Sequence, residues 1–421
     1  MRISGNIYLK GDKSLAHRAI MLASISNGES VIKNIPSSED IANTIEAMKV
    51  CGIDIQSSSD SIRVKGNTFR IPKMDINCGN SGTTMRLLAG LLSYKKISCR
   101  LVGDQSLLAR PMDRITEPLN KMGVQATSIN GCGPIGLEKF LNTSLNKIHI
   151  SIPSAQVKSA LILAALGCKN KIKIIERVKT RDHLELMLSK INSRIIEYRN
   201  GEIIISPYQD KLLEGFNIQL PGDISSASYL IAAAVIIDGS KLVINDLLLN
   251  SHRTGFIESL IEMGANIQID NEEIRFNEKI GRLTVKGDKN LRPININQTK
   301  IPSMIDEIPI LSLICAHIEG ESTISGLGEL RHKESNRLKG IFEILTAMGV
   351  EVLSDNINQI TIRGRKKLYN TNNINNLNDH RLAMMISVAQ IISGNNIDYP
   401  NCINVSFPDF KYLINQVMEN K

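Results

Sequence analysis

The stretch Asn378-Asp379-His380-Arg381-Leu382-Ala383-Met384-Met385 shows how this chain is built. A cluster of polar and charged residues stands directly before an apolar run, which is the pattern of a buried helix that begins at a charged end. Backbone N–H groups and the helix dipole make such an end attractive to anions. The stretch therefore predicts an anion-binding helix N-terminus.

The same pattern recurs roughly every 70 residues, and a fixed period of this kind indicates an internally repeated architecture. Each opening places hydroxyl, amide or charged groups before an apolar helix. If several of these helix ends met at one place, they would form a strong anion-binding site. The openings lie at residues 13–14, 80–84, 154–156, 223–226, 305–307 and 378–381.

Apolar periodicity and Gly positions predict the elements of the first two repeats. We expect strands at residues 2–9, 30–34 and 97–102, and helices at residues 14–26, 39–51, 83–92 and 111–122. Gly52, Gly123, Gly264 and Gly349 each follow a helical pattern and should adopt the left-handed conformation that ends a helix.

Three repeats precede the tripeptide Pro221-Gly222-Asp223 and three follow it, so we expect two lobes. One lobe would be residues 12–223, with Lys13, Arg18, Asn80, Arg110 and Gln156. The other would be residues 224–421, completed by the N-terminal strand in residues 1–11. We expect hinges near residues 11–12 and 221–224, and an active site between the lobes.

Composition narrows the class of partner. The chain has 421 residues, a net charge of +8, no Trp and only 4% aromatic residues. Its basic residues are scattered and are not interleaved with aromatic ones, so we expect small anionic molecules as partners and no nucleic acid. Its seven Cys residues form no CxxC pair, which is typical of the reducing cytoplasm. No apolar segment reaches the length of a membrane span, so we expect no membrane contact.

Two glycine-rich motifs do not support nucleotide binding. Residues 131–136 fit G-x-G-x-x-G, but Pro134 removes an N–H group that a phosphate cradle would need, and we expect a turn-rich loop there. Asp12 stands where a P-loop requires Gly before Lys13. No His/Cys set has zinc spacing, so no metal is expected.

The charged segments suggest chemistry on anions. If residues 331–337 were helical, Lys333 and Arg337 would be i, i+4 neighbours, with Glu334 beside them; a solvated surface is the alternative interpretation of this pattern. The trio Asp379-His380-Arg381 leads directly into a buried helix, where a plain surface role is less common. Many cations with few carboxylates suit highly anionic substrates and acid–base catalysis.

Nine motifs in order and spacing make nearly the whole chain similar to the 5-enolpyruvylshikimate-3-phosphate synthase (3-phosphoshikimate 1-carboxyvinyltransferase) family. They include residues 11–19 (GDKSLAHRA), 79–86 (GNSGTTMR), 154–160 (SAQVKSA), 180–183 (TRDH), 306–309 (DEIP) and 407–410 (FPDF). The resemblance implies a two-lobed inverse α/β barrel, with three βαβαββ repeats in each lobe.

The resemblance also implies the activity. Members transfer the enolpyruvyl group of phosphoenolpyruvate to the 5-hydroxyl of 3-phosphoshikimate and release phosphate, in the shikimate pathway to chorismate and the aromatic amino acids. Neither a metal nor an organic cofactor is implied. We expect a cytoplasmic monomer that is a target of glyphosate.

Motif by motif, the resemblance assigns roles to residues of this chain. Catalysis would fall to Asp306, Glu334 and Lys13. 3-Phosphoshikimate would be bound by Lys13, Ser14, Arg18, Ser154, Gln156, Asp306 and Lys333. Phosphoenolpyruvate would be bound by Lys13, Asn80, Gly82, Arg110, Gln156, Arg337 and Arg381.

Some positions depart from the commonest family pattern. Ala155 replaces a second Ser, and Val405 stands where some members have Lys. Lys158 and Arg181 resemble the second, more divergent class of the family. Gly82 is retained where strongly glyphosate-tolerant members carry Ala.

Two alternatives remain from the sequence. UDP-N-acetylglucosamine enolpyruvyl transferase shares the fold, but it has a Cys where this chain has Gln105. A non-enzymatic repeat protein that binds anions or RNA is the other; the charge clusters that open buried helices argue against it.

Overall fold

The computed structural model of this chain describes residues 2–141, 143–207, 213–287, 290–355, 357–365, 368 and 371–419. The chain forms two compact units. Unit 1 comprises Met1–Asp12, Pro221–Arg275 and Lys279–Lys421, and unit 2 comprises Lys13–Leu220 and Phe276–Glu278. The chain thus passes into unit 2 after Asp12 and returns to unit 1 at Pro221. At this crossing Asp12 N donates to Pro221 O at 2.8 Å, and Asp223 N donates to Lys10 O at 3.1 Å.

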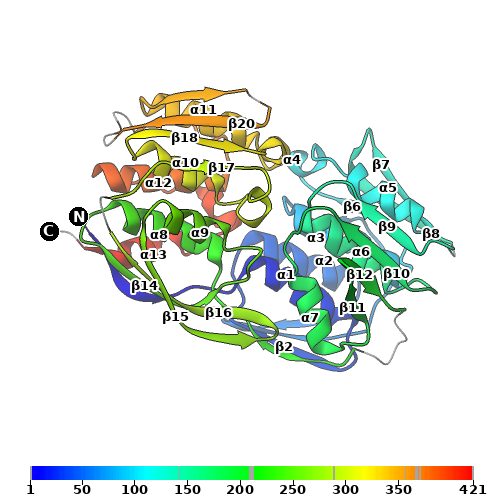
Figure 1. The fold of residues 1–421 in the computed structure, drawn as a ribbon. Coiled ribbons are helices and arrows are strands. Elements are labelled where there is room, and N and C mark those ends of the chain that lie inside the picture. The colour runs from blue at the N-terminus through cyan, green and yellow to red at the C-terminus, as the bar shows by residue number, and fades with distance from the viewer. Residues whose placement is uncertain are drawn as a thin grey trace. The chain divides into compact units, whose positions relative to one another are not determined.

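Unit 2 consists of three βαβαββ repeats (Figure 1). The first has β13 (Asn217–Gln219), α1 (Lys13–Ile25), β2 (Glu29–Lys33), α2 (Glu39–Val50), β3 (Asp54–Ser57) and β4 (Ser61–Lys65). The second has β5 (Ile76–Asn77), α3 (Gly82–Lys95), β6 (Cys99–Val102), α4 (Gln105–Leu108), α5 (Asp113–Lys121), β7 (Val124–Ile129) and β8 (Cys132–Phe140). The third has β9 (Lys147–Ile150), α6 (Ala155–Ala165), β10 (Ile172–Glu176), α7 (His183–Ile191), β11 (Ile196–Arg199) and β12 (Glu202–Ile205).

The three sheets of unit 2 share one strand order: β13-β2-β4-β3, β5-β6-β8-β7 and β9-β10-β12-β11. In each, the first two strands are parallel and the hairpin that follows is antiparallel. The first repeat takes its first strand from the end of the unit, because β13 pairs with β2.

Unit 1 repeats the same topology. Its first repeat has β1 (Arg2–Tyr8), α8 (Ile224–Ile236), β14 (Lys241–Leu248), α9 (Gly255–Glu262), β15 (Asn266–Arg275) and β16 (Glu278–Lys286). Its second has β17 (Asn295–Ile296), η1 (Ile301–Ser303), α10 (Ile308–Ala316), β18 (Gly320–Ser325), η2 (Gly328–His332), α11 (Arg337–Ala347), β19 (Glu351–Ser354) and β20 (Gln359–Gly364).

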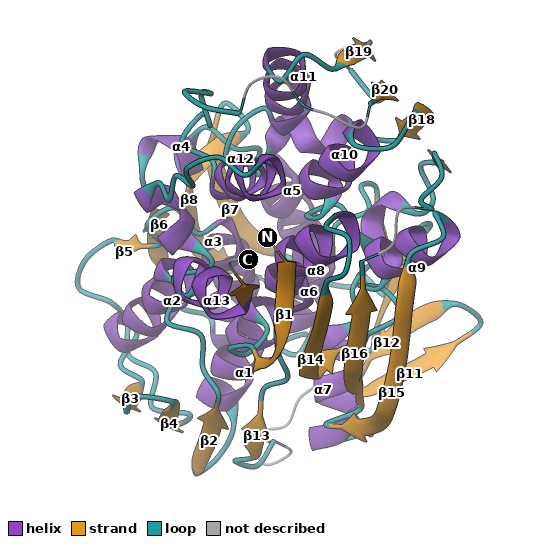
Figure 2. Ribbon diagram, turned by 90° about the vertical axis from the view of Figure 1, so that its left-hand side faces the viewer, coloured by secondary structure: helices purple, strands orange, loops and turns teal. Residues whose placement is uncertain are grey.

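The third repeat of unit 1 is shorter. In the described ranges it has α12 (His380–Ser393), η3 (Asn401–Val405), α13 (Phe410–Val417) and one strand, β21 (Met418–Glu419). That strand pairs with β1, which gives the five-stranded sheet β15-β16-β14-β1-β21. Figure 2 shows β1, β14, β16 and β15 side by side.

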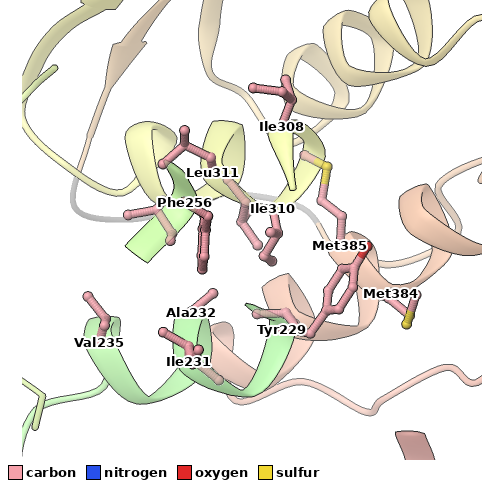
Figure 3. Packing of buried hydrophobic residues seen from close by; sticks show 14 of the residues in the cluster. Tyr229, Ile231, Ala232, Val235, Phe256, Ile308, Ile310, Leu311, Met384 and Met385 are labelled. Carbon is pink, nitrogen blue, oxygen red and sulfur yellow. The ribbon is translucent and has the colours of Figure 1, made fainter. Parts of the chain in front are cut away.

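The opening helix of every repeat is buried on nearly all sides: α1, α3 and α6 in unit 2, and α8, α10 and α12 in unit 1. All nine residues of α10 are buried, and this suits a sequence that is apolar around the whole helix. Side chains of α8, α9, α10 and α12 pack together in the core of unit 1 (Figure 3). Helices inside and sheets around them are the inverse α/β arrangement that the sequence predicts, so the predicted fold class is confirmed.

All six predicted openings lie at helix N-termini. Ser81, Ser154, Asp223 and Asp379 cap their helices by accepting hydrogen bonds from backbone N–H groups. α1 begins at Lys13 itself, and α10 begins directly after residues 305–307. The predicted helix-ending glycines are also confirmed, with φ of +86° at Gly123 and +96° at Gly264, for example.

Two local predictions are wrong. Residues 131–136 form no turn-rich loop: Gly131 lies in a hairpin turn and β8 begins at Cys132. Lys333 and Arg337 are not neighbours on one helix, since Lys333 is extended and α11 begins only at Arg337. The Asn336 side chain accepts from Lys339 N and so starts the helix there. Among the described residues, no helix is long and apolar enough to cross a membrane.

Candidate active site

Two clusters of charged side chains lie at the openings of the buried helices, one in each unit. In unit 2, the first turns of α1 and α6 are joined by Arg18, which is only 2% exposed. Its guanidinium donates to Ser159 Oγ at 2.9 Å and to the backbone oxygens of Ser14 and Ala155 at 2.8 and 3.5 Å. Arg18 therefore fixes the two helix ends that carry Ser14 and Ser154.

Lys13, the first residue of α1, keeps part of its side chain accessible. Its Nζ lies 2.6 Å from Asp40 Oδ2, and the two side chains are 17% and 11% exposed. An ion pair that solvent reaches is one that a more highly charged anion can displace or join. Lys13 therefore presents a partly accessible ammonium group at the α1 opening.

The second part of the unit 2 cluster surrounds the opening of α3. Arg110 donates through Nη2 to Asn80 Oδ1, and Asn80 donates through Nδ2 to Asp104. Gly82, the first residue of α3, has no side chain between these groups. A Cβ atom at Gly82 would lie 3.2 Å from Arg110 Nη1 and 3.3 Å from Arg86 Nη1. The glycine therefore leaves room for two guanidinium groups at one helix N-terminus.

Gln156 connects the openings of α6 and α3. Its Nε2 donates to Thr83 Oγ1 at 2.9 Å, and its Oε1 accepts from Arg86 Nη1. Arg86 also donates to Pro111 O at 3.1 Å. The predicted residues Asn80, Gly82, Arg110 and Gln156 are thus brought together within unit 2.

The sequence-based site left out two cations that the structure brings to this cluster. Arg86 lies against Gly82 and Gln156, as described above. Arg181 donates through Nη1 to Ser14 Oγ at 3.5 Å, across 167 residues of sequence. Both residues fall inside motifs of the sequence analysis, GNSGTTMR and TRDH, but no local pattern indicates that either contacts the cluster.

In unit 1, the charged cluster is centred on Asp306, which belongs to the opening of α10 and lies two residues before the helix begins. Its Oδ1 lies 3.5 Å from Arg337 Nη1, 3.6 Å from Arg381 Nε and 3.9 Å from Lys333 Nζ. These cations come from separate segments: the start of α11, the start of α12 and the segment after η2. The predicted residues of this unit therefore meet, although the helical spacing expected for Lys333 and Arg337 is wrong.

Buried ion pairs hold the cations of unit 1 in place. Arg337 is 1% exposed, donates through Nε to Asp379 Oδ2 at 2.8 Å and contacts Glu334 through Nη2. Burial alone would raise the pKa of Asp379, but the charges of Arg337 and then His380 outweigh it and hold that pKa below its ordinary value. Burial would likewise lower the pKa of Arg381, but Asp306 and its other neighbours raise it well above the usual range. Both arginines are therefore permanently charged.

Exposure separates the four carboxylates around the openings of α10, α11 and α12 into two groups. The side chains of Asp379 and Glu307 are almost completely buried, and their partners are Arg337 and Ser225. The side chains of Asp306 and Glu334 are 15% and 25% exposed. Of these four carboxylates, Asp306 and Glu334 are the accessible ones, and these two are the carboxylates that the sequence analysis assigns to catalysis.

Chemically, the two clusters combine fixed positive charge with a few accessible acid–base groups. Such an arrangement can bind phosphate and carboxylate groups and can move protons. Among the described residues, no group of three or more His, Cys, Asp or Glu side chains could hold a metal ion.

The family model for EPSP synthase (3-phosphoshikimate 1-carboxyvinyltransferase) matches residues 1–413. A 3-phosphoshikimate 1-carboxyvinyltransferase of Caldicellulosiruptor bescii is 38% identical over 415 residues, which are 97% of this chain and 95% of the relative. One of Petrotoga mobilis is 38% identical over 423 residues, covering 99% and 97%.

Solved structures are similar to this chain over nearly its whole length. An EPSP synthase from Acinetobacter baumannii superposes with a TM-score of 0.83 at 33% identity, covering 99% of this chain and 96% of that one. The enolpyruvyl transferase NikO from Streptomyces tendae has a TM-score of 0.76 at 15% identity, covering 99% and 95%. The second similarity concerns the fold alone.

Proposed function

Since this chain belongs to the EPSP synthase (3-phosphoshikimate 1-carboxyvinyltransferase) family, we infer that its two charged clusters perform the reaction of that family. The protein transfers the enolpyruvyl group of phosphoenolpyruvate to the 5-hydroxyl of 3-phosphoshikimate and releases phosphate, a step of aromatic amino acid biosynthesis in the shikimate pathway.

The reaction sets clear demands on the protein. The 5-hydroxyl loses its proton as its oxygen bonds to C2 of phosphoenolpyruvate, and the methylene carbon C3 gains a proton. The tetrahedral intermediate then loses a proton from C3 as the C–O bond to phosphate breaks. Both substrates carry phosphate and carboxylate groups. The site must therefore offer many cations and at least one group that both accepts and returns a proton.

Substrate binding is assigned to residues of both units. We propose that 3-phosphoshikimate is bound by Lys13, Ser14, Arg18, Ser154, Gln156, Asp306 and Lys333. Phosphoenolpyruvate is assigned to Lys13, Asn80, Gly82, Arg110, Gln156, Arg337 and Arg381. The contacts within unit 2 support this division, because Arg110, Asn80 and Gly82 form one cluster and Arg18 ties Ser14 to the α6 opening.

Proton transfer is assigned to Asp306 and Glu334, with Lys13 as a further acid. The observation that carries this assignment is the position of Asp306: its carboxylate lies within 3.9 Å of three cations and yet remains 15% exposed. Neighbouring cations favour the ionised form of a carboxylate, which is the form that can accept a proton. The accessible part of the side chain lets this carboxylate contact the substrate hydroxyl.

Turnover of Asp306→Asn and Glu334→Gln tests the assignment. Each change keeps the shape of the side chain but removes proton exchange, so turnover at saturating substrates should fall by about 10²–10⁴. Glu321→Gln is a matched control, because this carboxylate in the same unit forms a surface pair with Arg363 and is 53% exposed. Near wild-type turnover of folded Glu334→Gln would remove Glu334 from the mechanism and leave Asp306 with Lys13.

We also propose that the protein acts as a cytoplasmic monomer without nucleic acid and is inhibited by glyphosate. The Cys usage of the sequence supports the cytoplasmic location, and the scattered basic residues support the absence of nucleic acid. Sedimentation of the purified protein, and inhibition of phosphate release by glyphosate in competition with phosphoenolpyruvate, would test this proposal.

A further inference from the structure

A short segment of unit 2, residues 180–183, is held by buried charged side chains that the reaction itself does not use. It joins β10 to α7. Lys158 on α6 is completely buried, and its Nζ lies 2.8 Å from Glu185 Oε1 and 3.1 Å from Glu176 Oε1. It also donates to Thr180 O at 3.0 Å. The ammonium group thus binds two carboxylates and one backbone oxygen of the segment.

Glu176 also binds Thr180. Its Oε2 accepts from Thr180 Oγ1 at 2.9 Å and from Thr180 N at 3.2 Å. The backbone N–H, the backbone oxygen and the hydroxyl of Thr180 are therefore all bonded to one buried ion pair. This leaves the backbone at Thr180 little freedom to rotate.

The other end of the segment is fixed by the tip of the hairpin between β15 and β16. His183 Nδ1 lies 2.7 Å from Glu278 Oε1, and these side chains are 0% and 1% exposed. Asn277 Nδ2 donates to Leu186 O at 3.2 Å, and the rings of Phe276 and Phe216 lie 5.4 Å apart. Three consecutive residues of the tip thus pack in unit 2.

Arg181 lies between these two fixed ends. Its Nη1 faces Ser14 Oγ at 3.5 Å, next to Lys13 at the opening of α1. Arg181 is partly exposed, whereas Thr180 and His183 on either side are buried. The buried contacts therefore set the position of one accessible guanidinium.

We propose that Lys158, Glu176 and Glu278 are positioning residues for 3-phosphoshikimate, because they hold residues 180–183 so that Arg181 stands beside Ser14. The proposal rests on the proposed function, in which Ser14 contacts 3-phosphoshikimate. Buried ion pairs add little to stability compared with well-packed apolar side chains, so stability alone gives no reason for so many charges here. Their benefit is a fixed geometry, which reduces the ordering that binding would otherwise require.

Two pairs of variants test the proposal. Thr180→Val removes the hydroxyl but keeps the shape, whereas Thr180→Ser keeps the hydroxyl. Glu278→Ala removes the acceptor of His183, whereas Glu278→Gln keeps one. The affinity for 3-phosphoshikimate should fall about ten-fold in Thr180→Val and Glu278→Ala, since a hydrogen bond to a charged group is lost. Thr180→Ser and Glu278→Gln should bind like wild type, and the KM for phosphoenolpyruvate should stay unchanged in all four.

A double-mutant cycle separates positioning from plain stability. In an Arg181→Gln background, Thr180→Val should cause no further loss of 3-phosphoshikimate affinity, because the guanidinium that it positions is gone. Additive losses, or equal rises of KM for both substrates, would overturn the proposal, as would wild-type affinity in folded Thr180→Val.

Calorimetry with 3-phosphoshikimate, run beside thermal unfolding, keeps the two levels of inference apart. If wild type itself failed to bind 3-phosphoshikimate, the proposed function would fall. If wild type bound and folded Thr180→Val and Glu278→Ala bound equally well, only the positioning role would fall. Should Glu278→Ala not fold, the Thr180 pair alone decides.

Discussion

Replacing Gly82 by Ala should separate substrate binding from stability. The added Cβ would lie 3.2 Å from Arg110 Nη1 and 3.3 Å from Arg86 Nη1. Both atoms are far ends of flexible side chains, so they can yield by a few tenths of an ångström and the fold should tolerate the change. Ala also suits a helix better than Gly, by about 0.5–1 kcal/mol.

The loss should appear in phosphoenolpyruvate binding. A hydrogen bond between a charged group and an anion contributes about 1.5–3 kcal/mol, and displacement of the guanidinium groups should forfeit at least the lower figure for one of them. Because 1.4 kcal/mol corresponds to about ten-fold in affinity, the KM for phosphoenolpyruvate should rise about ten-fold or more. The KM for 3-phosphoshikimate and the Tm should stay near wild type.

Steady-state kinetics with each substrate varied in turn, together with thermal unfolding, measures both effects. Gly328→Ala serves as the control, because its Cβ would meet only Asn358 Oδ1 at 3.5 Å and Ile357 O at 3.8 Å, which are ordinary contacts. Equal rises in KM for the two substrates, or an unchanged KM for phosphoenolpyruvate, would refute the reasoning.

Three further predictions concern the ion pairs and the two units. Arg337→Ala should weaken phosphoenolpyruvate binding more than 3-phosphoshikimate binding, and Arg381→Ala should share this kinetic effect. Arg337→Ala should also lower the free energy of unfolding by about 3–5 kcal/mol, because it leaves the carboxylate of Asp379 buried without the guanidinium group of Arg337. Steady-state kinetics measures the first effect and urea unfolding the second. Because the pKa of Asp379 is lowered in the folded protein, its contribution to stability is present above the ordinary Asp pKa of 3.8 and is lost as the pH falls through the lower, folded value. Asp379→Asn should therefore make the free energy of unfolding less dependent on pH in acid. The same pH dependence in the variant and in wild type would contradict the lowered pKa of Asp379. Because residues of both units are assigned to one reaction, 3-phosphoshikimate with glyphosate should reduce the radius of gyration in small-angle scattering, and an unchanged value in demonstrably bound protein would count against closure.

The positions of the helix openings could be predicted from the local sequence. A capping residue such as Ser81 or Asp379 before an apolar run is a signal contained within a few residues, and the structure confirms such a cap at the openings of α3, α6, α8 and α12. The site residues that the motifs assign also meet within their own units. These site residues were identified by the resemblance to a known family, whereas the contacts between them could be seen only in the structure.

The parts that could not be predicted depend on long-range contacts. β13 has three residues and becomes a strand only by pairing with β2, which precedes it by 186 residues, as in the pair Asn217 and Val31. Arg181 reaches Ser14 across 167 residues. The helix expected across residues 333–337 does not form, and the reason is local. The side chain of Asn336 caps α11, so the helix begins at Arg337 rather than before Lys333.

The pairing of β1 with β14 has a consequence for the synthesis of the protein. Ser4 pairs with Lys241, so β1 must wait for the synthesis of more than 230 further residues before its neighbour leaves the ribosome. At about 5–20 residues per second this delay is on the order of ten seconds or more. Residues 13–220 can meanwhile begin to fold as a nearly complete unit, since β13 closes their first sheet. During that interval β1 is an unpaired strand edge, which exposes it to incorrect pairing and makes it a segment that a chaperone could protect.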